Sequence, residues 1–223
     1  MNVTRMLGLK GHKEEIFVKD AIKLYRENPS DIYSEAFFKK RHFKDNRWKL
    51  QVGKMLSKIY HLESLVDFGC GEGEYLAGAL KAGVKNVLGF EYLLENVKKY
   101  LSVKELKYIK YGNVMSPIYC GSFDCAMSIE VAEHILPDKS GEFVDNLANA
   151  SKKYILLTAA PPGQGGIAHI NERLREFWIK QFRERDFIYL AEEASKIHVK
   201  IKEANIQIPD YFFNLLVFIK DGE

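Results

Sequence analysis

The hydrophobic pattern of the chain changes near residue 60. Residues 13–60 are predicted to be helical, with a break at 28–31, where the sequence reads Asn-Pro-Ser-Asp. Beyond this point, short apolar runs alternate with amphipathic stretches. We therefore predict an N-terminal helical cap or lid over residues 1–60 and one structural unit over residues 61–223.

The apolar runs after residue 60 predict seven strands separated by helices. Strands that alternate with helices form parallel βαβ units, and right-handed crossovers place the helices on both faces of the sheet. This predicts an α/β fold with a doubly wound, mostly parallel, Rossmann-like sheet. The last apolar run is predicted to be a buried strand, either parallel to its neighbours or inserted antiparallel between them. The strands are expected at 64–68, 86–91, 107–111, 123–128, 154–158, 187–190 and 211–219, and helices at about 74–82, 93–102, 139–150 and 171–184.

Composition narrows the class of protein. The 223 residues suffice for one sizeable core, and a net charge of +3 does not favour a nucleic-acid partner. The three cysteines form no CxxC pair, which argues against a disulfide framework or a zinc knuckle and favours a reducing compartment. We find no signal-peptide core and no spanning segment, so we expect a cytoplasmic protein without a membrane partner. The sequence pattern does not indicate which oligomeric state the protein has.

The segment VDFGCGEG, residues 66–73, lies where the first predicted strand of the sheet meets its helix. Glycines at such a turn let the backbone approach a ligand without a Cβ clash. Glu91 ends the next strand, about 20 residues after Gly71. A carboxylate there can accept hydrogen bonds from both ribose hydroxyls, so the pattern predicts a nucleoside site at the carboxyl ends of the strands.

Two cofactors fit a nucleoside site of this kind. A dinucleotide fingerprint requires a third glycine where this chain has Glu74, and Glu72 and Glu74 would repel a pyrophosphate at the helix N-terminus. S-adenosylmethionine has no phosphate and carries a sulfonium and an ammonium group, which suit acidic surroundings. We favour S-adenosylmethionine; a dinucleotide oxidoreductase and a glycine turn that serves packing alone are the alternatives.

Two segments resemble motifs of class I S-adenosylmethionine-dependent methyltransferases. VDFGCGEG resembles the first motif and FDCAMSIEVAEHI the fourth-strand motif. The resemblance runs from about residue 60 to the C-terminus, and it implies that the glycine turn lies against the methionine part of the cofactor. Asn113 stands where the superfamily often has Asp beside the adenine, a mild departure. The cofactor residues that the resemblance implies are Asp67, Gly69, Cys70, Gly71, Glu91, Tyr92, Asn113, Val114 and Glu130.

The loops after the fourth and fifth predicted strands carry the candidate catalytic residues. If the IEVAEHI segment is helical, Glu130, Glu133 and His134 share one face of the helix. The fifth strand opens into a loop rich in proline and glycine that contains His169. Because these strands are expected to be neighbours, we expect His134 and His169 to lie near the transferred methyl group.

Three interpretations of these residues stay open. In the first, His134 or His169 is a general base for an attacking hydroxyl, with Glu133 beside them. In the second, Glu130, Glu133, His134 and His169 hold a divalent metal ion that lowers the pKa of the hydroxyl. EVAEH resembles the magnesium-binding run of small-RNA 2′-O-methyltransferases and ubiquinone-pathway O-methyltransferases. In the third, these side chains only fix the loop. We favour the base, and so predict no metal.

Together the patterns predict an S-adenosylmethionine-dependent methyltransferase that O-methylates a small polar or sugar-like acceptor. Tyr33 and Phe37 of the cap are expected to close over the cofactor, and Asn171 to cap the helix that follows it. A metal-assisted RNA 2′-O-methyltransferase, with the basic stretch 39–41 as its RNA contact, is one alternative. A non-catalytic partner subunit that binds the cofactor is the other.

Overall fold

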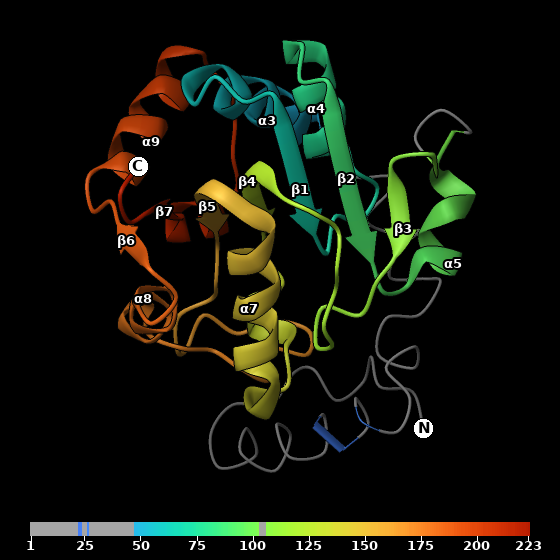
Figure 1. Cartoon of the computed structure of the whole chain (residues 1–223), viewed down its shortest axis with the longest axis vertical. Coiled ribbons are helices and arrows are strands. Elements are labelled where there is room, and N and C mark those ends of the chain that lie inside the picture. Colours follow the sequence, from blue (N-terminus) through green and yellow to red (C-terminus); the bar gives the residue numbers. More distant parts are fainter. Residues whose placement is uncertain (1–21, 24–25, 27–46, 103–105) are drawn as a thin grey trace.

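The computed structural model describes residues 22–23, 26, 47–102 and 106–223. They form a seven-stranded sheet in the order β3-β2-β1-β4-β5-β7-β6, in which β7 runs antiparallel to both β5 and β6 (Figure 1). The other paired strands are parallel. The predicted doubly wound, mostly parallel sheet is confirmed. The strands are β1 (Ser64–Phe68), β2 (Asn86–Glu91), β3 (Ile109–Tyr111), β4 (Phe123–Ser128), β5 (Ser151–Leu157), β6 (Phe187–Tyr189) and β7 (Leu216–Lys220).

Helices cover both faces of the sheet, as Figure 1 shows. One face packs against α3 (Arg47–Ile59), α4 (Glu74–Ala82) and α9 (Glu193–Glu203). The other packs against α7 (Ser140–Ala150) and α8 (Arg175–Arg183). The shorter segments are α5 (Leu94–Val97) and the 3₁₀ helices η3 (Lys98–Tyr100), η4 (Ala132–His134), η5 (Pro137–Lys139) and η6 (Asp210–Asn214).

The central strand β1 is buried on both faces, which explains its apolar sequence. Val66 and Phe68 pack in the core under α7 and α8, whereas Leu65 packs in the core under α3, α4 and α9. Successive side chains of a strand alternate between faces, so Asp67 points to the same side as Leu65. Asp67 is 2% exposed. A buried carboxyl inside an apolar strand marks the place where this face of the sheet is not filled by core.

Helices α3 and α4 touch through their backbones. A Cβ added at Gly53 would lie 2.4 Å from the carbonyl oxygen of Tyr75, and one added at Gly78 would lie 2.2 Å from that of Leu50. Only glycine permits this approach. The last helix of the predicted N-terminal segment therefore packs directly on the first helix after β1. The boundary at residue 60 stays a prediction.

Several predicted elements differ from the structure. The predicted strand 211–219 begins at Leu216, because η6 occupies its first residues. The predicted helix 93–102 is divided into α5 and η3, and α9 was not predicted. Helix α8 begins at Arg175, so Asn171 does not cap it. Asn171 is buried instead, and its amide donates to the carbonyl of Ala132 and to Ser140 Oγ.

Among the described residues, no helix has the length and apolarity needed to cross a membrane. Tyr33, Phe37 and the basic stretch 39–41 lie outside the described residues, as do most of the helices predicted before residue 47.

Candidate active site

The glycine turn after β1 has the geometry that requires glycine. Gly69, Gly71 and Gly73 have φ angles of 80°, 56° and 74°, all in the left-handed region. A Cβ at Gly69 would lie 2.4 Å from a methyl group of Val131, whereas one at Gly71 would meet nothing within 4 Å. The turn therefore packs against the loop after β4 and faces open space at Gly71.

Glu91 at the tip of β2 is bonded to this turn. Its carboxylate accepts the N–H of Gly71 at 3.0 Å and that of Leu93 at 2.9 Å. A carboxylate has about four acceptor positions, so these two bonds orient the group without exhausting it. The two parts of the predicted nucleoside site thus meet. Beside them, the rings of Tyr92 and Tyr111 lie 5.9 Å apart at the tips of β2 and β3.

Asn113 and Val114 follow β3 and form a turn beside the same edge of the sheet. The side-chain oxygen of Asn113 accepts the N–H of Met115 at 3.0 Å. Val114 is 7% exposed, and its carbonyl accepts an N–H from the Asn146 side chain at 2.9 Å. Asn113 therefore uses one of its acceptor positions to hold the local turn.

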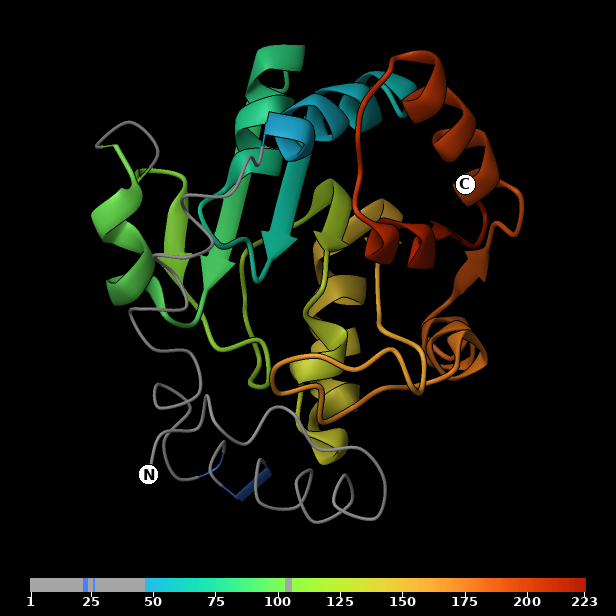
Figure 2. The same cartoon turned by 180° about the vertical axis from the view of Figure 1, so that it is seen from behind.

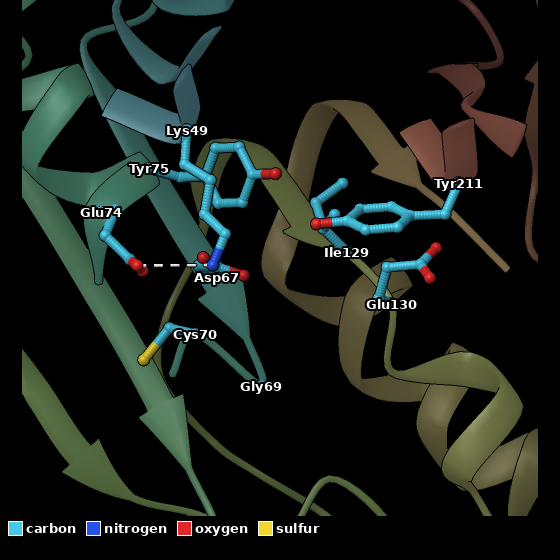
Figure 3. Close-up of a pocket in the computed structure, with 9 residues that line it drawn as sticks. All are labelled: Lys49, Asp67, Gly69, Cys70, Glu74, Tyr75, Ile129, Glu130 and Tyr211. Carbon is cyan, nitrogen blue, oxygen red and sulfur yellow. Dashed lines mark hydrogen bonds and ion pairs between the residues drawn. The ribbon is translucent and has the colours of Figure 1, made fainter. Parts of the chain in front are cut away.

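A pocket lies beside the glycine turn after β1, between the start of α4 and the loop after β4 (Figure 3). Four of the predicted cofactor residues line it, and sequence reasoning did not assign the other five. The predicted residues are Asp67, Gly69, Cys70 and Glu130; the missed residues are Lys49, Glu74, Tyr75, Ile129 and Tyr211.

The pocket carries more negative than positive charge. Lys49 Nζ lies 3.3 Å from Glu74 Oε1, with Asp67 next to them (Figure 3). The pKa of Asp67 is raised to about 8, first by burial and then by the charges of Glu74 and Glu91, against the opposing effect of Lys49. Glu130 adds another carboxyl group on the opposite wall. Such a pocket suits a ligand that brings positive charge, as the sulfonium and ammonium groups of S-adenosylmethionine do.

Two of the missed residues have different signals in the sequence. Lys49 is 7% exposed and precedes Val52 and Leu56, which are buried on the same helix, at intervals of three and seven residues. The sequence signal for Lys49 was therefore a lysine placed on the apolar face of its helix. Tyr211 had none, because the run 211–219 reads as one apolar strand and only the 3₁₀ turn η6 brings the ring to the pocket.

The loops after β4 and β5 bring the predicted catalytic residues together. The ring centroids of His134 and His169 lie 4.9 Å apart, with the ring planes at 82°. One ligand atom from each of Glu133, His134 and His169 lies within 4.8 Å of the others. Glu130 does not belong to this group, which we call the histidine cluster (Glu133, His134 and His169).

The segment that carries these residues is not the predicted helix. Glu130 has a φ of 59°, and η4 begins only at Ala132. Thr158 holds this strained residue: its Oγ1 accepts the Glu130 N–H at 2.8 Å and donates to Glu130 Oε1 at 2.9 Å. The prediction of one shared helical face was wrong. Glu130 lines the cofactor pocket, while Glu133 and His134 join the histidine cluster.

Both imidazoles are oriented through Nδ1. His134 Nδ1 lies 3.1 Å from the carbonyl oxygen of Ala168, and His169 Nδ1 lies 3.0 Å from Glu172 Oε1. A carbonyl and an ionised carboxylate can only accept, so both partners require Nδ1 to carry the hydrogen. In the neutral rings Nε2 is then the accepting nitrogen, which a general base or a metal ligand requires.

Backbone hydrogen bonds join the two loops. The N–H groups of Ile170 and Asn171 both donate to the carbonyl of Glu133, at 3.0 and 2.9 Å. Figure 2 shows the segment after β5 running beside the segment after β4 at this end of the sheet. Ile22 packs against the small apolar cluster of Ala168 and Ile170, and Arg26 lies 3.1 Å from Asp138. The N-terminal segment therefore contacts both loops.

Glu133 is the polar residue whose burial is least compensated. Its side chain is fully buried, and neither carboxyl oxygen has a hydrogen-bond partner among the described residues. Burial, followed by the charge of Glu130, raises the pKa of Glu133 well above its usual value. A carboxyl with two imidazoles is a donor set that suits divalent metals, and a cation there would supply the missing partner.

Comparisons with known proteins agree with this fold. Residues 66–153 match a methyltransferase domain model. The fold is similar to magnesium protoporphyrin IX methyltransferase from Synechocystis PCC 6803, with TM-score 0.60, 11% identity, and coverage of 91% of this chain and 99% of that one. It is also similar to the methyltransferase domain of bacterial Hen1 (TM-score 0.55, 19% identity, coverage 79% and 99%). A third similar structure is a sugar N-methyltransferase from Streptoalloteichus (TM-score 0.57, 11% identity, coverage 83% and 92%). No curated protein sequence matches significantly.

The domain match and the sheet define the class. Residues 66–153 form a methyltransferase domain, and the chain has the Rossmann-like fold of class I methyltransferases, which use S-adenosylmethionine. The neighbours named for a porphyrin and for a sugar share this fold, so the class alone does not select the acceptor.

Proposed function

We propose that the protein transfers a methyl group to a hydroxyl of a small polar or sugar-like acceptor, with His134 or His169 as the general base. The observation that carries the proposal is the pair of imidazoles whose Nδ1–H groups are both held by acceptors. In each neutral ring Nε2 is then the basic atom. The loop after β4 carries both His134 and Glu130, which lines the pocket.

For this reaction the chain has to align the methyl group with the acceptor hydroxyl and to supply a base. S-adenosylmethionine, when bound, supplies an electrophilic methyl group on a sulfonium. Glu91 would hold the ribose, and Asp67 and Glu130 would offset the positive charge of the methionine part. The acceptor hydroxyl would lie against the histidine cluster, where imidazole takes its proton as the oxygen attacks.

A metal-assisted transfer is the second candidate. The unpartnered carboxyl of Glu133, grouped with two imidazoles within 4.8 Å, favours it. In that case Glu133, His134 and His169 would hold a divalent cation that lowers the pKa of the acceptor hydroxyl. Glu130, the fourth ligand considered from the sequence, would contribute to the cofactor pocket instead.

Kinetics with and without EDTA separate the two candidates. Methyl transfer to a panel of monosaccharides and polyols is measured for wild type, His134→Ala and His169→Ala. A general base predicts that loss of the basic histidine lowers kcat by about 100-fold or more and that EDTA has no effect. A metal site predicts that EDTA stops wild-type turnover and that Mg²⁺ or Mn²⁺ restores it. His198→Ala, which removes a histidine on α9, is the control. Equal turnover in all variants would disprove both candidates.

A further inference from the structure

Glu172 lies three residues after His169 and belongs to no motif considered above. Its carboxylate accepts three N–H groups: Gly163 on Oε2 at 2.7 Å, and Gly165 and His169 Nδ1 on Oε1 at 2.7 and 3.0 Å. The side chains of Glu172 and His169 are only 17% and 11% exposed. One carboxylate therefore fixes both the loop after β5 and the imidazole that this loop carries.

The backbone prepares this position for an anion. Gly163 and Gly165 have φ angles of 88° and 69°. Left-handed residues in such turns bring amide N–H groups to one side and create a concave anion site. Here the anion is the chain's own Glu172, so the loop fixes the carboxylate, and the carboxylate in turn orients the ring.

Gly166 packs against the His169 ring. A Cβ added at Gly166 would lie 2.3 Å from His169 Nε2 and 2.6 Å from both Cδ2 and Cε1, too close for any side chain. These three distances place the Cβ over the face of the ring, so only glycine lets the backbone lie there. His134 supports the ring at its edge, 4.9 Å between centroids. The His169 ring is thus oriented from Nδ1, and glycine at position 166 leaves room for the ring.

We propose that Glu172 is a positioning residue that makes His169, rather than His134, the base. This inference rests on the proposed hydroxyl methylation. Nε2 takes the hydroxyl proton while the oxygen bonds to the methyl carbon and the carbon–sulfur bond breaks; the products are an imidazolium, a methyl ether and a neutral thioether. Glu172 faces the positive charge that His169 gains, as the carboxylate of a catalytic triad does. His134 Nδ1 faces a neutral carbonyl instead.

The first test reads the tautomer of His169 directly and needs no acceptor. ¹⁵N NMR of the histidine-labelled full chain is expected to show Nδ1–H in wild type. In Glu172→Ala the acceptor is absent, so this variant should show a shifted or mixed tautomer. In Glu172→Gln a single amide oxygen remains to accept, and the NH₂ group cannot accept an amide N–H, so a smaller shift is expected. Glu176→Gln, with a side chain 71% exposed on α8, is the matched control. An unchanged His169 signature in both Glu172 variants would overturn the proposal.

The second test asks whether Glu172 acts through His169. Glu172→Gln should lower kcat by about 100-fold, with affinity for S-adenosylhomocysteine retained. The double variant with His169→Ala should be no slower than His169→Ala alone, because the two residues act as a unit. A further loss in the double variant would show that Glu172 acts elsewhere, against the proposal. If His169→Ala alone keeps the wild-type rate, the proposed function fails at this residue, whatever the tautomer measurement gives.

Gly166→Ala sharpens the same test. The methyl group would clash with the face of the His169 ring, so it should displace the ring from Glu172 and lower kcat. Gly141→Ala, where the nearest atom would lie 3.9 Å away, is the control. Wild-type turnover in Gly166→Ala would show that methyl transfer does not need the His169 ring in this position, against the proposal.

Discussion

The proposed site has two halves that are built in different ways. The cofactor half consists of the glycine turn and Glu91, and the acceptor half consists of the histidine cluster and the two loops that carry it. The cofactor half is local: the glycine turn directly follows β1, and Glu91 directly ends β2. The acceptor half depends on contacts between distant segments, such as those of Ile170 with Glu133 and of His134 with Ala168. The difference teaches that backbone turns can position a cofactor, whereas the proposed catalytic side chains need two loops that hold each other.

The largest expected effect concerns the buried carboxyl of the cofactor half. The pKa of Asp67 is about 8 in the folded chain, above its ordinary value of 3.8. The stabilising contribution of Asp67 is therefore complete below about pH 4 and is lost as the pH rises to about 8, with a size of several kcal/mol. Asp67→Asn removes this loss, so the free variant should be more stable than wild type at pH 8 to 9. Thermal unfolding between pH 5 and 9 measures the difference.

The same substitution should weaken the binding of the cofactor. A cationic ligand favours the ionised carboxylate, so wild-type affinity for S-adenosylmethionine should rise with pH up to about 8, with proton release on binding below that pH. Asp67→Asn should bind more weakly and lose this rise. Calorimetry in buffers of different ionisation enthalpy counts the protons. Asp145→Asn, at a carboxylate 54% exposed, is the control. A pH-independent wild-type affinity would contradict the assignment of Asp67 to the pocket.

Next in size is the loss of Glu91, which should affect the cofactor half alone. Glu91→Ala removes the acceptor for the Gly71 and Leu93 N–H groups and for the ribose. Charged hydrogen bonds of this kind are worth about 1.5–3 kcal/mol, so affinity for S-adenosylhomocysteine should fall by about 100-fold. Glu95→Ala, a carboxylate 79% exposed on α5, should change nothing. Histidine NMR signals that moved in Glu91→Ala would show that the two halves are coupled.

This division also explains what the sequence could predict. β1, β2, β4 and α4 match their predicted bounds, because the alternation of apolar runs and the glycine turn are local patterns. The fold and the contact of Gly71 with Glu91 followed from such patterns. Asn171 was misassigned as a helix cap, since its partners lie on the loop after β4 and at the start of α7, more than 30 residues earlier in the chain. Glu172 was missed because its role depends on the left-handed glycines of one loop.

A smaller effect is expected where one hydroxyl joins the two loops. Thr158→Val keeps the shape but removes both hydrogen bonds to Glu130 and leaves a strained N–H without its acceptor. We expect a loss of about 1–3 kcal/mol in the free energy of unfolding and slower methyl transfer. Thr158→Ser retains the hydroxyl and should recover most of the stability. Chemical denaturation measures both variants. If Val and Ser behave alike, the hydroxyl does not hold this loop.

The smallest effect should come from the contact between the N-terminal segment and the acceptor half. Arg26 and Asp138 form an ion pair with side chains 56% and 58% exposed, and such pairs contribute about 0–1 kcal/mol. Arg26→Ala should therefore leave stability and affinity for S-adenosylhomocysteine nearly unchanged. Because the pair lies beside the loop that carries His134, we expect the KM for the acceptor to rise by a few fold and to depend less on salt. Steady-state kinetics at low and high ionic strength measure both. A KM equal to that of wild type would mean that the ion pair of Arg26 with Asp138 joins these segments without contributing to acceptor binding.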